Sequence, residues 1–200
     1  MGVIRAPAAP ESLPIWPALP RPEDGRLLFL DVETQRSAEE VGGWGSVPAM
    51  GLALAVVYEP SHHEFRTYRE REVDRLLLDL MAADKVVGFN IDRFDIPVLS
   101  SYTPHDLHRI RTLDMLGLIR GRLGFRVGLG HIAEANLGAG KTADGLQSLR
   151  WFREGRFDLI ESYCRQDVEI TAKLFFLGRQ RGYLLYRDGE GRLLRVPVDW

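Results

Sequence analysis

Acidic side chains stand at three places in the chain where metal-dependent chemistry could use them. Asp31 and Glu33 follow a short apolar run, Asp95 follows a second apolar segment, and Tyr163 and Asp167 are neighbours in a long amphipathic stretch. Clustered carboxylates repel one another, and hard divalent cations such as Mg²⁺ or Mn²⁺ offset this repulsion because they prefer oxygen ligands. The residue types therefore predict a site for two such ions, which together promote in-line phosphoryl displacement.

The spacing inside each group agrees with a shared site. Residues i and i+2 of a strand point to the same face, so Asp31 and Glu33 can meet if the preceding apolar run is a strand. Residues i and i+4 of a helix share a face, so Tyr163 and Asp167 are neighbours. A tyrosine titrates at about pH 10, and Tyr163 is therefore expected to orient the attacking water rather than to act as a strong base.

The elements that must position these residues follow from the apolar patterns. Three runs with short connections, at residues 27–30, 50–58 and 64–68, predict an antiparallel meander. Further strands are predicted at residues 86–89 and 110–113, and helices at residues 72–83, 92–101, 128–137, 146–152 and 157–177. Residues 183–198 predict a closing hairpin with its turn at 188–191. The expected architecture is an α/β fold with a mixed five-stranded sheet flanked by helices and a C-terminal hairpin.

The chain of 200 residues divides into three predicted parts. Residues 1–25 are rich in proline and alanine, which predicts an irregular tail. Residues 26–180 are expected to form one α/β domain, and residues 181–200 a C-terminal β-hairpin extension. A domain of this length can bury a core without disulfides.

The composition limits the class of protein. The net charge is −2, so a nucleic-acid role cannot rest on overall charge. No apolar run approaches the ~18 residues that span a membrane, and the first residues lack the apolar core of a secretory signal. The single cysteine, Cys164, excludes an intrachain disulfide, and no cysteine or histidine cluster has the spacing of a zinc site. We therefore expect a cytoplasmic protein with no membrane partner.

Three short motifs carry a resemblance to a known family. Residues 28–34, residues 88–90 with 94–99, and residues 163–167 resemble, in this order, the three motifs of the DEDD superfamily of 3′–5′ exonucleases, in its tyrosine-bearing subgroup. The chain is similar to the proofreading exonuclease domain of family-B DNA polymerases and to bacterial ribonuclease H-like exonuclease domains, over about residues 27–178. The resemblance implies a ribonuclease H-like fold, two Mg²⁺ or Mn²⁺ ions, and release of nucleoside monophosphates from the 3′ end of single-stranded DNA or RNA.

The resemblance also implies a role for each carboxylate. Asp31 would bridge both metal ions, while Glu33 and Asp167 would bind the ion that activates water. Asp95 would support the second ion. Asp92 lies close to Asp95 in the sequence, but Phe94 and the residues after Asp95 match the family motif and favour Asp95.

The substrate contacts are predicted from the same motifs. Asn90 and Phe94 would shape the substrate cleft, and Thr34 at the end of the first motif is a further predicted substrate contact. Residues 35–44 depart from the polymerase version, which leaves the substrate open. Trp44 could stack on a base, as aromatic residues do in single-strand binding, or it could pack over a turn.

Several features have two interpretations. Five arginines could track phosphates or form a solvated face: Arg109, Arg111, Arg120, Arg122 and Arg126. Asp114 is interpreted as a helix N-cap in preference to a peripheral site carboxylate. Residues 135–142 satisfy a relaxed P-loop pattern, but the residues before them predict a helix rather than the strand that a P-loop requires.

The leading hypothesis is a metal-dependent 3′–5′ exonuclease that acts on single-stranded nucleic acid, with DNA favoured over RNA. One alternative is a structure-specific endonuclease on the same fold. Another is a non-catalytic module that binds nucleic acid or a helicase. A helicase or other repair protein is the predicted protein partner.

Overall fold

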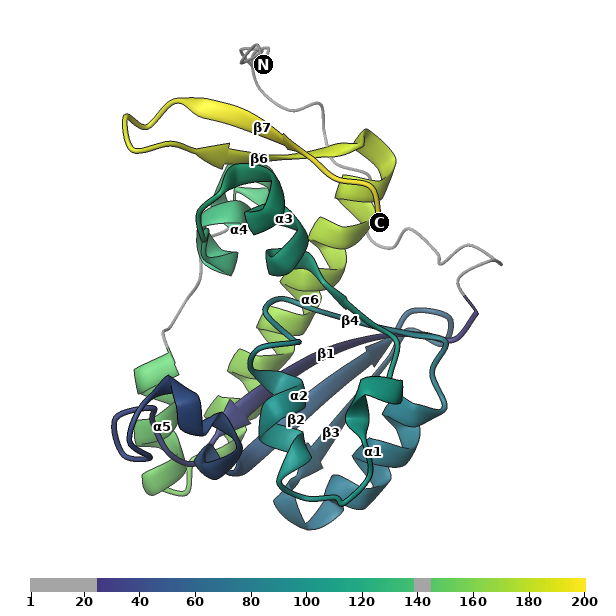
Figure 1. The fold of residues 1–200 in the computed structure, drawn as a ribbon, viewed down its shortest axis with the longest axis vertical. Coiled ribbons are helices and arrows are strands. Elements are labelled where there is room, and N and C mark those ends of the chain that lie inside the picture. Colours follow the sequence, from purple (N-terminus) through teal and green to yellow (C-terminus); the bar gives the residue numbers. More distant parts are fainter. Residues whose placement is uncertain (1–24, 139–144) are drawn as a thin grey trace.

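The computed structural model describes residues 25–138 and 145–200, which contain one five-stranded sheet and one two-stranded sheet (Figure 1). The larger sheet has the strand order β3-β2-β1-β4-β5. Its strands are β1 (Leu27–Thr34), β2 (Leu52–Glu59), β3 (Glu64–Arg69), β4 (Lys85–Gly88) and β5 (Thr112–Asp114). Strands β1, β2 and β3 are antiparallel neighbours, whereas β4 pairs in parallel with β1 and β5. The predicted meander and the mixed five-stranded sheet are both confirmed.

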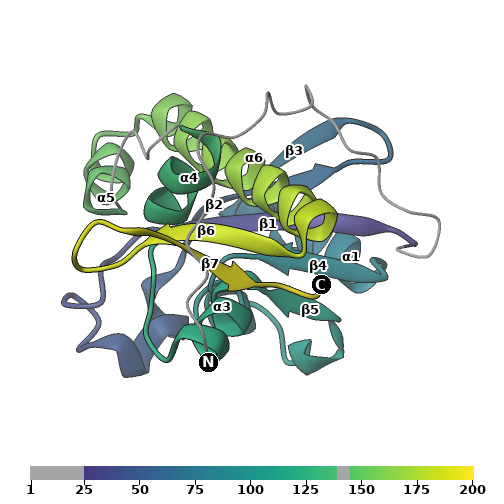
Figure 2. The ribbon, with the colours of Figure 1, turned by 90° about the horizontal axis from the view of Figure 1, so that it is seen from above.

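Six α-helices and three short 3-10 helices lie in the described residues. The α-helices are α1 (Val73–Met81), α2 (Asp95–Ser100), α3 (Met115–Leu123), α4 (Leu129–Leu137), α5 (Gly145–Arg153) and α6 (Phe157–Arg181). The 3-10 helices are η2 (Trp44–Met50), η3 (Glu70–Glu72) and η4 (Leu107–Arg109). Helix α6 crosses one face of the sheet, and α1 lies on the opposite face (Figure 2). None of the described helices combines the length and the hydropathy that crossing a bilayer requires.

The alternation along β1 decides which side chains reach each helical layer. Leu27 and Phe29 belong to the core that β1 shares with α6, and Leu28 and Leu30 belong to the core that it shares with α1 and α2. Successive strand residues point to opposite faces, so the odd-numbered residues of β1 face α6. Asp31 and Glu33 lie within the strand, and the same alternation turns both toward the long helix.

A C-terminal hairpin covers the helices at one end of the molecule. It consists of β6 (Tyr183–Arg187) and β7 (Leu193–Pro197), which pair antiparallel. The buried side chain of Asn136 in α4 fixes the hairpin, because its amide donates to the Leu185 carbonyl at 2.7 Å and accepts from the Leu185 N–H at 2.9 Å. The predicted hairpin is thus present, with a five-residue connection at 188–192.

Two predictions about helices need correction. No helix was predicted at α3, and the helix predicted for residues 92–101 is shorter, since α2 begins at Asp95. Helix α3 contains Gly117 and Gly121, which interrupt its apolar pattern; the Asp114 carboxylate marks its start by accepting from the Gly117 N–H at 3.1 Å. The predicted N-cap role of Asp114 is therefore confirmed.

Two predictions concern residues that lie largely outside the described part of the chain. The irregular tail at 1–25 and the loop end at 139–142 lie outside the described residues, apart from Gly25. Leu129–Leu137 before that loop end is a helix, as predicted, and Gly138 caps it in the left-handed conformation. The division of the chain into a tail, a domain and an extension stays a prediction.

Candidate metal centre

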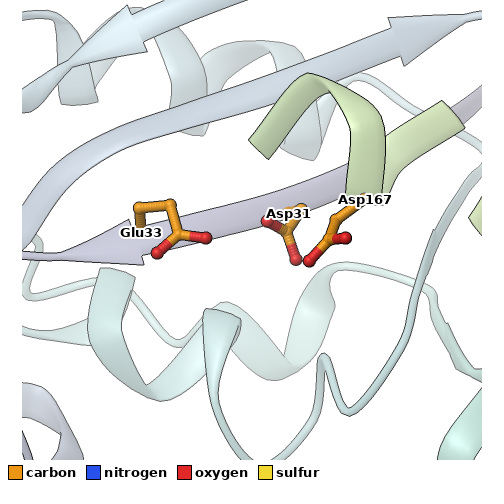
Figure 3. A group of neighbouring side chains, drawn as sticks. All are labelled: Asp31, Glu33 and Asp167. Carbon is orange, nitrogen blue, oxygen red and sulfur yellow. The ribbon is translucent and has the colours of Figure 1, made fainter. Parts of the chain in front are cut away.

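Three carboxylates meet between the sheet and the long helix. Asp31 and Glu33 come from β1 and Asp167 comes from α6, and Figure 3 shows the Asp31 and Asp167 carboxylates turned toward each other, with Glu33 farther along the strand. One ligand oxygen from each residue lies within 4.8 Å of the others, a grouping that could hold a metal ion. The predicted convergence of these three residues is therefore found in the structure.

The helix is held against the strand directly beside this cluster. The Cys164 thiol, one turn before Asp167, donates to the backbone carbonyl of Asp31 at 3.3 Å. Burial raises the pKa of the Cys164 thiol well above its ordinary value, and the nearby charge of Asp31 raises it further. Cys164 is therefore a neutral donor that fixes the distance between the two elements and not a nucleophile.

The electrostatics of the cluster favour a bound cation. Burial raises the pKa of Asp31 well above its ordinary value, and the charges of Asp167, Glu33 and Asp95 raise it further. The Oδ2 atom of Asp31 is buried and accepts no hydrogen bond from the described residues. An unpartnered carboxylate oxygen beside like charges is costly, and a hard divalent cation is the partner that removes the cost.

Asp95 reaches the same region from the opposite helical layer. It occupies the first turn of α2, its residue is 3% exposed, and its Oδ1 atom has no hydrogen-bond partner among the described residues. Burial raises the pKa of Asp95, whereas hydrogen bonding to its own backbone and to that of Val32 lowers it; the charges of Asp114 and Glu33 raise it again. Asp95 does not belong to the group formed by Asp31, Glu33 and Asp167, but the charge of Glu33 raises its pKa.

Tyr163 lies one turn before Asp167 on α6 and is 5% exposed. Its ring meets the ring of Trp151 in α5 edge to face, with the centroids 6.2 Å apart. This contact positions Tyr163, and it could not be predicted from the sequence because α5 and α6 meet only through tertiary packing. The i, i+4 relation between Tyr163 and Asp167 is confirmed.

Asn90 has an unusual backbone that its neighbours hold in place. Its φ angle is 77°, in the left-handed region that asparagine tolerates better than most residues. The Asp114 carboxylate accepts from the Asn90 N–H at 2.9 Å, and Arg126 donates to the Asn90 side-chain oxygen at 3.2 Å. Asp114 thus has a second role beyond the helix cap, which orients the turn leading to Asp95.

Two aromatic residues flank this turn. The Phe94 ring lies 6.4 Å from the Trp44 ring, centroid to centroid, and Trp44 at the start of η2 is 73% exposed. Both interpretations of Trp44, stacking on a base and packing over a turn, stay predictions. Thr34 is buried, and its hydroxyl donates to the Arg36 carbonyl at 3.0 Å, so it stabilises the bend that follows β1.

The five arginines separate into different surroundings. Arg120 and Arg126 line a pocket beside Asn90, whereas Arg122 pairs with Asp199 at 2.8 Å. Arg109 belongs to η4, and Arg111 is exposed. Both interpretations of these arginines, phosphate contacts and a solvated face, stay predictions.

One comparison with known proteins agrees with this fold. No curated protein matches the chain. A family model described as the RNase_H superfamily matches residues 28–177, which include the large sheet except Leu27 of β1, the four carboxylates and Tyr163. The matched range covers the greater part of the chain, and membership suggests a nuclease-type function. The chain belongs to the ribonuclease H superfamily.

Proposed function

We propose that the protein is a metal-dependent 3′–5′ exonuclease of single-stranded nucleic acid, with DNA as the favoured substrate, in the tyrosine-bearing subgroup of the DEDD superfamily. One observation carries the proposal: the carboxylates of Asp31, Glu33 and Asp167 converge, and the buried Asp31 Oδ2 has no hydrogen-bond partner in the described part of the chain. The 3′–5′ polarity and the subgroup rest on the motif resemblance described above.

The donor set is chemically suited to Mg²⁺ or Mn²⁺. Asp31, Glu33 and Asp167 would hold the cations, and Asp95 would complete the site from α2. Two such ions, when bound, activate a water molecule and stabilise the departing 3′-oxygen.

The protein's own groups prepare the attack in two ways. Tyr163 stands one helical turn from Asp167, and its hydroxyl would orient the attacking water; Trp151 fixes the ring. The Cys164 thiol ties α6 to β1 and so keeps Asp167 opposite Asp31. Since both contacts exist in the folded protein, little rearrangement is needed when substrate binds.

The substrate would enter past the aromatic pair. The exposed Trp44 and the neighbouring Phe94 offer ring faces on which bases can stack, whatever their sequence. Asn90, held by Asp114 and Arg126, would contact the strand beside them. We propose that Thr34 acts indirectly, because it braces the bend that leads toward Trp44.

A panel of end-labelled substrates tests this function. Single- and double-stranded DNA and RNA, labelled at either end, are incubated with Mn²⁺, with Mg²⁺ or with EDTA. We expect single nucleoside 5′-monophosphates to leave the 3′ end of single strands in the presence of metal. A 5′-labelled substrate should shorten step by step, and a circular single strand should survive.

The other outcomes of the panel identify the alternatives. Cleavage of circular single strands would instead support a structure-specific endonuclease. Tight strand binding without any hydrolysis, together with no divalent-metal binding by calorimetry, would support a non-catalytic module. The proposed protein partner, a helicase or other repair protein, rests on the resemblance alone and is tested separately by co-purification.

A further inference from the structure

A pocket of about 490 Å³ lies beside Asn90, at the ends of β4 and β5. Five charged residues line it: Arg93, Arg120, Arg126, Asp92 and Asp114. Strands β1, β4 and β5 are parallel, so their C-terminal ends lie at one edge of the sheet. The pocket and the carboxylate cluster therefore open from the same edge.

The two carboxylates in the pocket already accept hydrogen bonds from other groups of the protein. Asp114 accepts from the N–H groups of Asn90 and Gly117, at 2.9 and 3.1 Å. Asp92 accepts from the Thr112 hydroxyl at 2.6 Å. These hydrogen bonds engage one oxygen of each carboxylate, and the three arginines of the lining outnumber its two aspartates, so the charged groups of the lining favour an anion.

The arginine side chains of the pocket, unlike its two aspartates, are available to bind a ligand. Within residues 25–138 and 145–200, no ion pair engages Arg93 or Arg120, and both side chains are exposed. Arg126 is exposed and donates to the neutral Asn90 side chain. A guanidinium presents its N–H groups as a planar fork that matches two oxygens of one phosphate.

One wall of the pocket is bare helix backbone. Gly121 in α3 and Gly124 at its end both line the pocket, and a Cβ atom built at either glycine would meet no atom within 4 Å. The space in front of this wall is therefore open, and a bulky ligand group can approach the helix closely.

One turn of the chain links the pocket to the metal centre. The Phe94 N–H donates to the Asn90 carbonyl at 3.0 Å, and Asp95 follows Phe94 directly. A strand whose 3′ end reaches the carboxylates can thus lay an adjoining phosphate in the pocket.

We propose that this pocket binds a backbone phosphate of the single-stranded substrate, upstream of its 3′ end. The proposal rests on the nuclease function proposed above. None of the described lining residues is aromatic, so the pocket offers charge and not base stacking. A phosphodiester fits this lining better than a base does, and contact with it would be independent of sequence.

Fluorescence anisotropy with a labelled single-stranded oligonucleotide tests the subsite. Binding is measured in EDTA, so that hydrolysis does not interfere, and over a range of salt concentrations. Arg120→Gln should weaken binding about three- to tenfold and reduce the slope of log K against log salt by about 0.7, the value for one phosphate contact on a single strand. Gly121→Glu, which places a carboxylate in the open space of the pocket, should weaken binding more.

Arg122→Gln is the matched control. It removes the same charge from the same helix, but Arg122 pairs with Asp199 and is not among the residues lining the pocket. Binding by this variant should stay within about twofold of wild type and keep the wild-type salt slope, apart from the small effect of overall charge. Thermal unfolding of all three variants checks that each is folded.

The outcomes distinguish failure of the phosphate subsite from failure of the proposed nuclease function. If Arg120→Gln and Gly121→Glu bind like wild type, or if Arg122→Gln loses as much as Arg120→Gln, the subsite is wrong even where hydrolysis is normal. If both pocket variants lose affinity but the wild type hydrolyses nothing, the phosphate subsite stands and the nuclease function fails. A nucleoside 5′-monophosphate that displaces the oligonucleotide as strongly as unlabelled strand does would reassign the pocket to the free nucleotide and overturn the proposal.

Discussion

Asp31 in β1 and Asp167 in α6 place their carboxylates against each other, with Glu33 within reach of both (Figure 3). After burial, the charge of Asp167 is the largest cause that raises the pKa of Asp31. Two like charges this close, in surroundings with little water, oppose the folded state. The geometry that would bind metal therefore destabilises the metal-free protein, and this conflict can be measured.

Asp31→Asn should stabilise the metal-free protein. The change removes a carboxyl group whose ionisation burial and neighbouring charges oppose, and whose Oδ2 has no hydrogen-bond partner in the described residues. In EDTA at neutral pH we expect Tm to rise by about 2–4 °C, the shift that about 1 kcal/mol produces in a chain of this size. The same variant should lose the rise in Tm that Mn²⁺ gives the wild type. A lower Tm in EDTA with unchanged stabilisation by Mn²⁺ would contradict this account of the cluster.

The stability of the metal-free protein should depend on pH with a definite sign. The pKa values of Asp31 and Asp95 are raised mainly by burial, so these carboxyls keep their protons in the folded state after the unfolded chain has lost them at about pH 4. The unfolded state then binds fewer protons, and stability falls as pH rises from about 4 through the raised values.

Acidic groups elsewhere act in the opposite direction. The pKa values of Glu59 and Asp79 are lowered, despite burial, by hydrogen bonds from neighbouring arginine and tyrosine side chains. Their contribution is complete above about pH 4.5 and is lost as pH falls through the lowered values. Urea unfolding in EDTA should therefore give maximal stability in mildly acidic solution and a decline toward neutral pH. Saturating Mn²⁺ should remove the decline, and a decline that persists unchanged would place its origin outside the metal centre.

Glu59→Gln should destabilise the fold at a distance from the site. The buried Glu59 carboxylate accepts from Arg26 at 3.0 and 3.1 Å and from Arg66 at 2.6 Å, so its loss leaves two guanidinium groups facing a neutral amide. Both arginines are partly exposed, and we expect a loss of about 2 kcal/mol, below the range for fully buried pairs. Glu64→Gln, which removes only the exposed partner of Arg66, should cost less than about 0.5 kcal/mol in the same urea titration. Equal losses in the two variants would refute the assignment.

Two glycines beside the pocket should respond oppositely to alanine. Gly121 lies inside α3, and a Cβ there meets no atom within 4 Å, so Gly121→Ala should stabilise the protein by about 0.5–1 kcal/mol through helix propensity. Gly124 caps the helix with φ 82°, so Gly124→Ala should destabilise it by about 1 kcal/mol. Chemical denaturation measures both changes. The local geometry would be disproved by a stabilising Gly124→Ala.

Trp44→Ala should weaken strand binding without changing stability. The side chain is 73% exposed, so its removal costs little packing. Base–aromatic stacking contributes about 1–3 kcal/mol per base, and Kd for a single strand should rise about fivefold or more. Trp44→Phe should restore most of the affinity, whereas Leu78→Ala, at another exposed apolar residue on α1, should have no effect. An unchanged Kd for Trp44→Ala would remove this residue from the substrate path.

The parts of the site that follow local periodicity could be predicted from the sequence. The alternation of a strand predicted a common face for Asp31 and Glu33, and the two residues share a face of β1. The helical spacing predicted that Tyr163 and Asp167 are neighbours, and both lie on α6. Both patterns depend only on the geometry of a single element. The match to three ordered motifs then supplied Asp95, whose position on a different layer no single-element pattern could give.

Contacts between distant segments could not be predicted in this way. Trp151 meets Tyr163 only because α5 packs against α6, and Arg126 reaches Asn90 across a loop and a helix. Helix α3 could not be predicted because its glycines interrupt the apolar pattern. Its stability comes from its cap and its tertiary packing rather than from helix propensity. The pocket beside Asn90 is a product of these long-range contacts.

The most direct test of the metal centre is the rate of nucleoside-monophosphate release from a single-stranded oligonucleotide, measured for the wild type and for Asp167→Asn, with Mn²⁺ and with EDTA. We predict release by the wild type only with Mn²⁺. The variant should be slower by more than about a hundredfold, because loss of outer partners of metal ligands alone costs about 10- to 100-fold. Release by the wild type in EDTA, or an undiminished rate in a folded Asp167→Asn protein, would contradict the account.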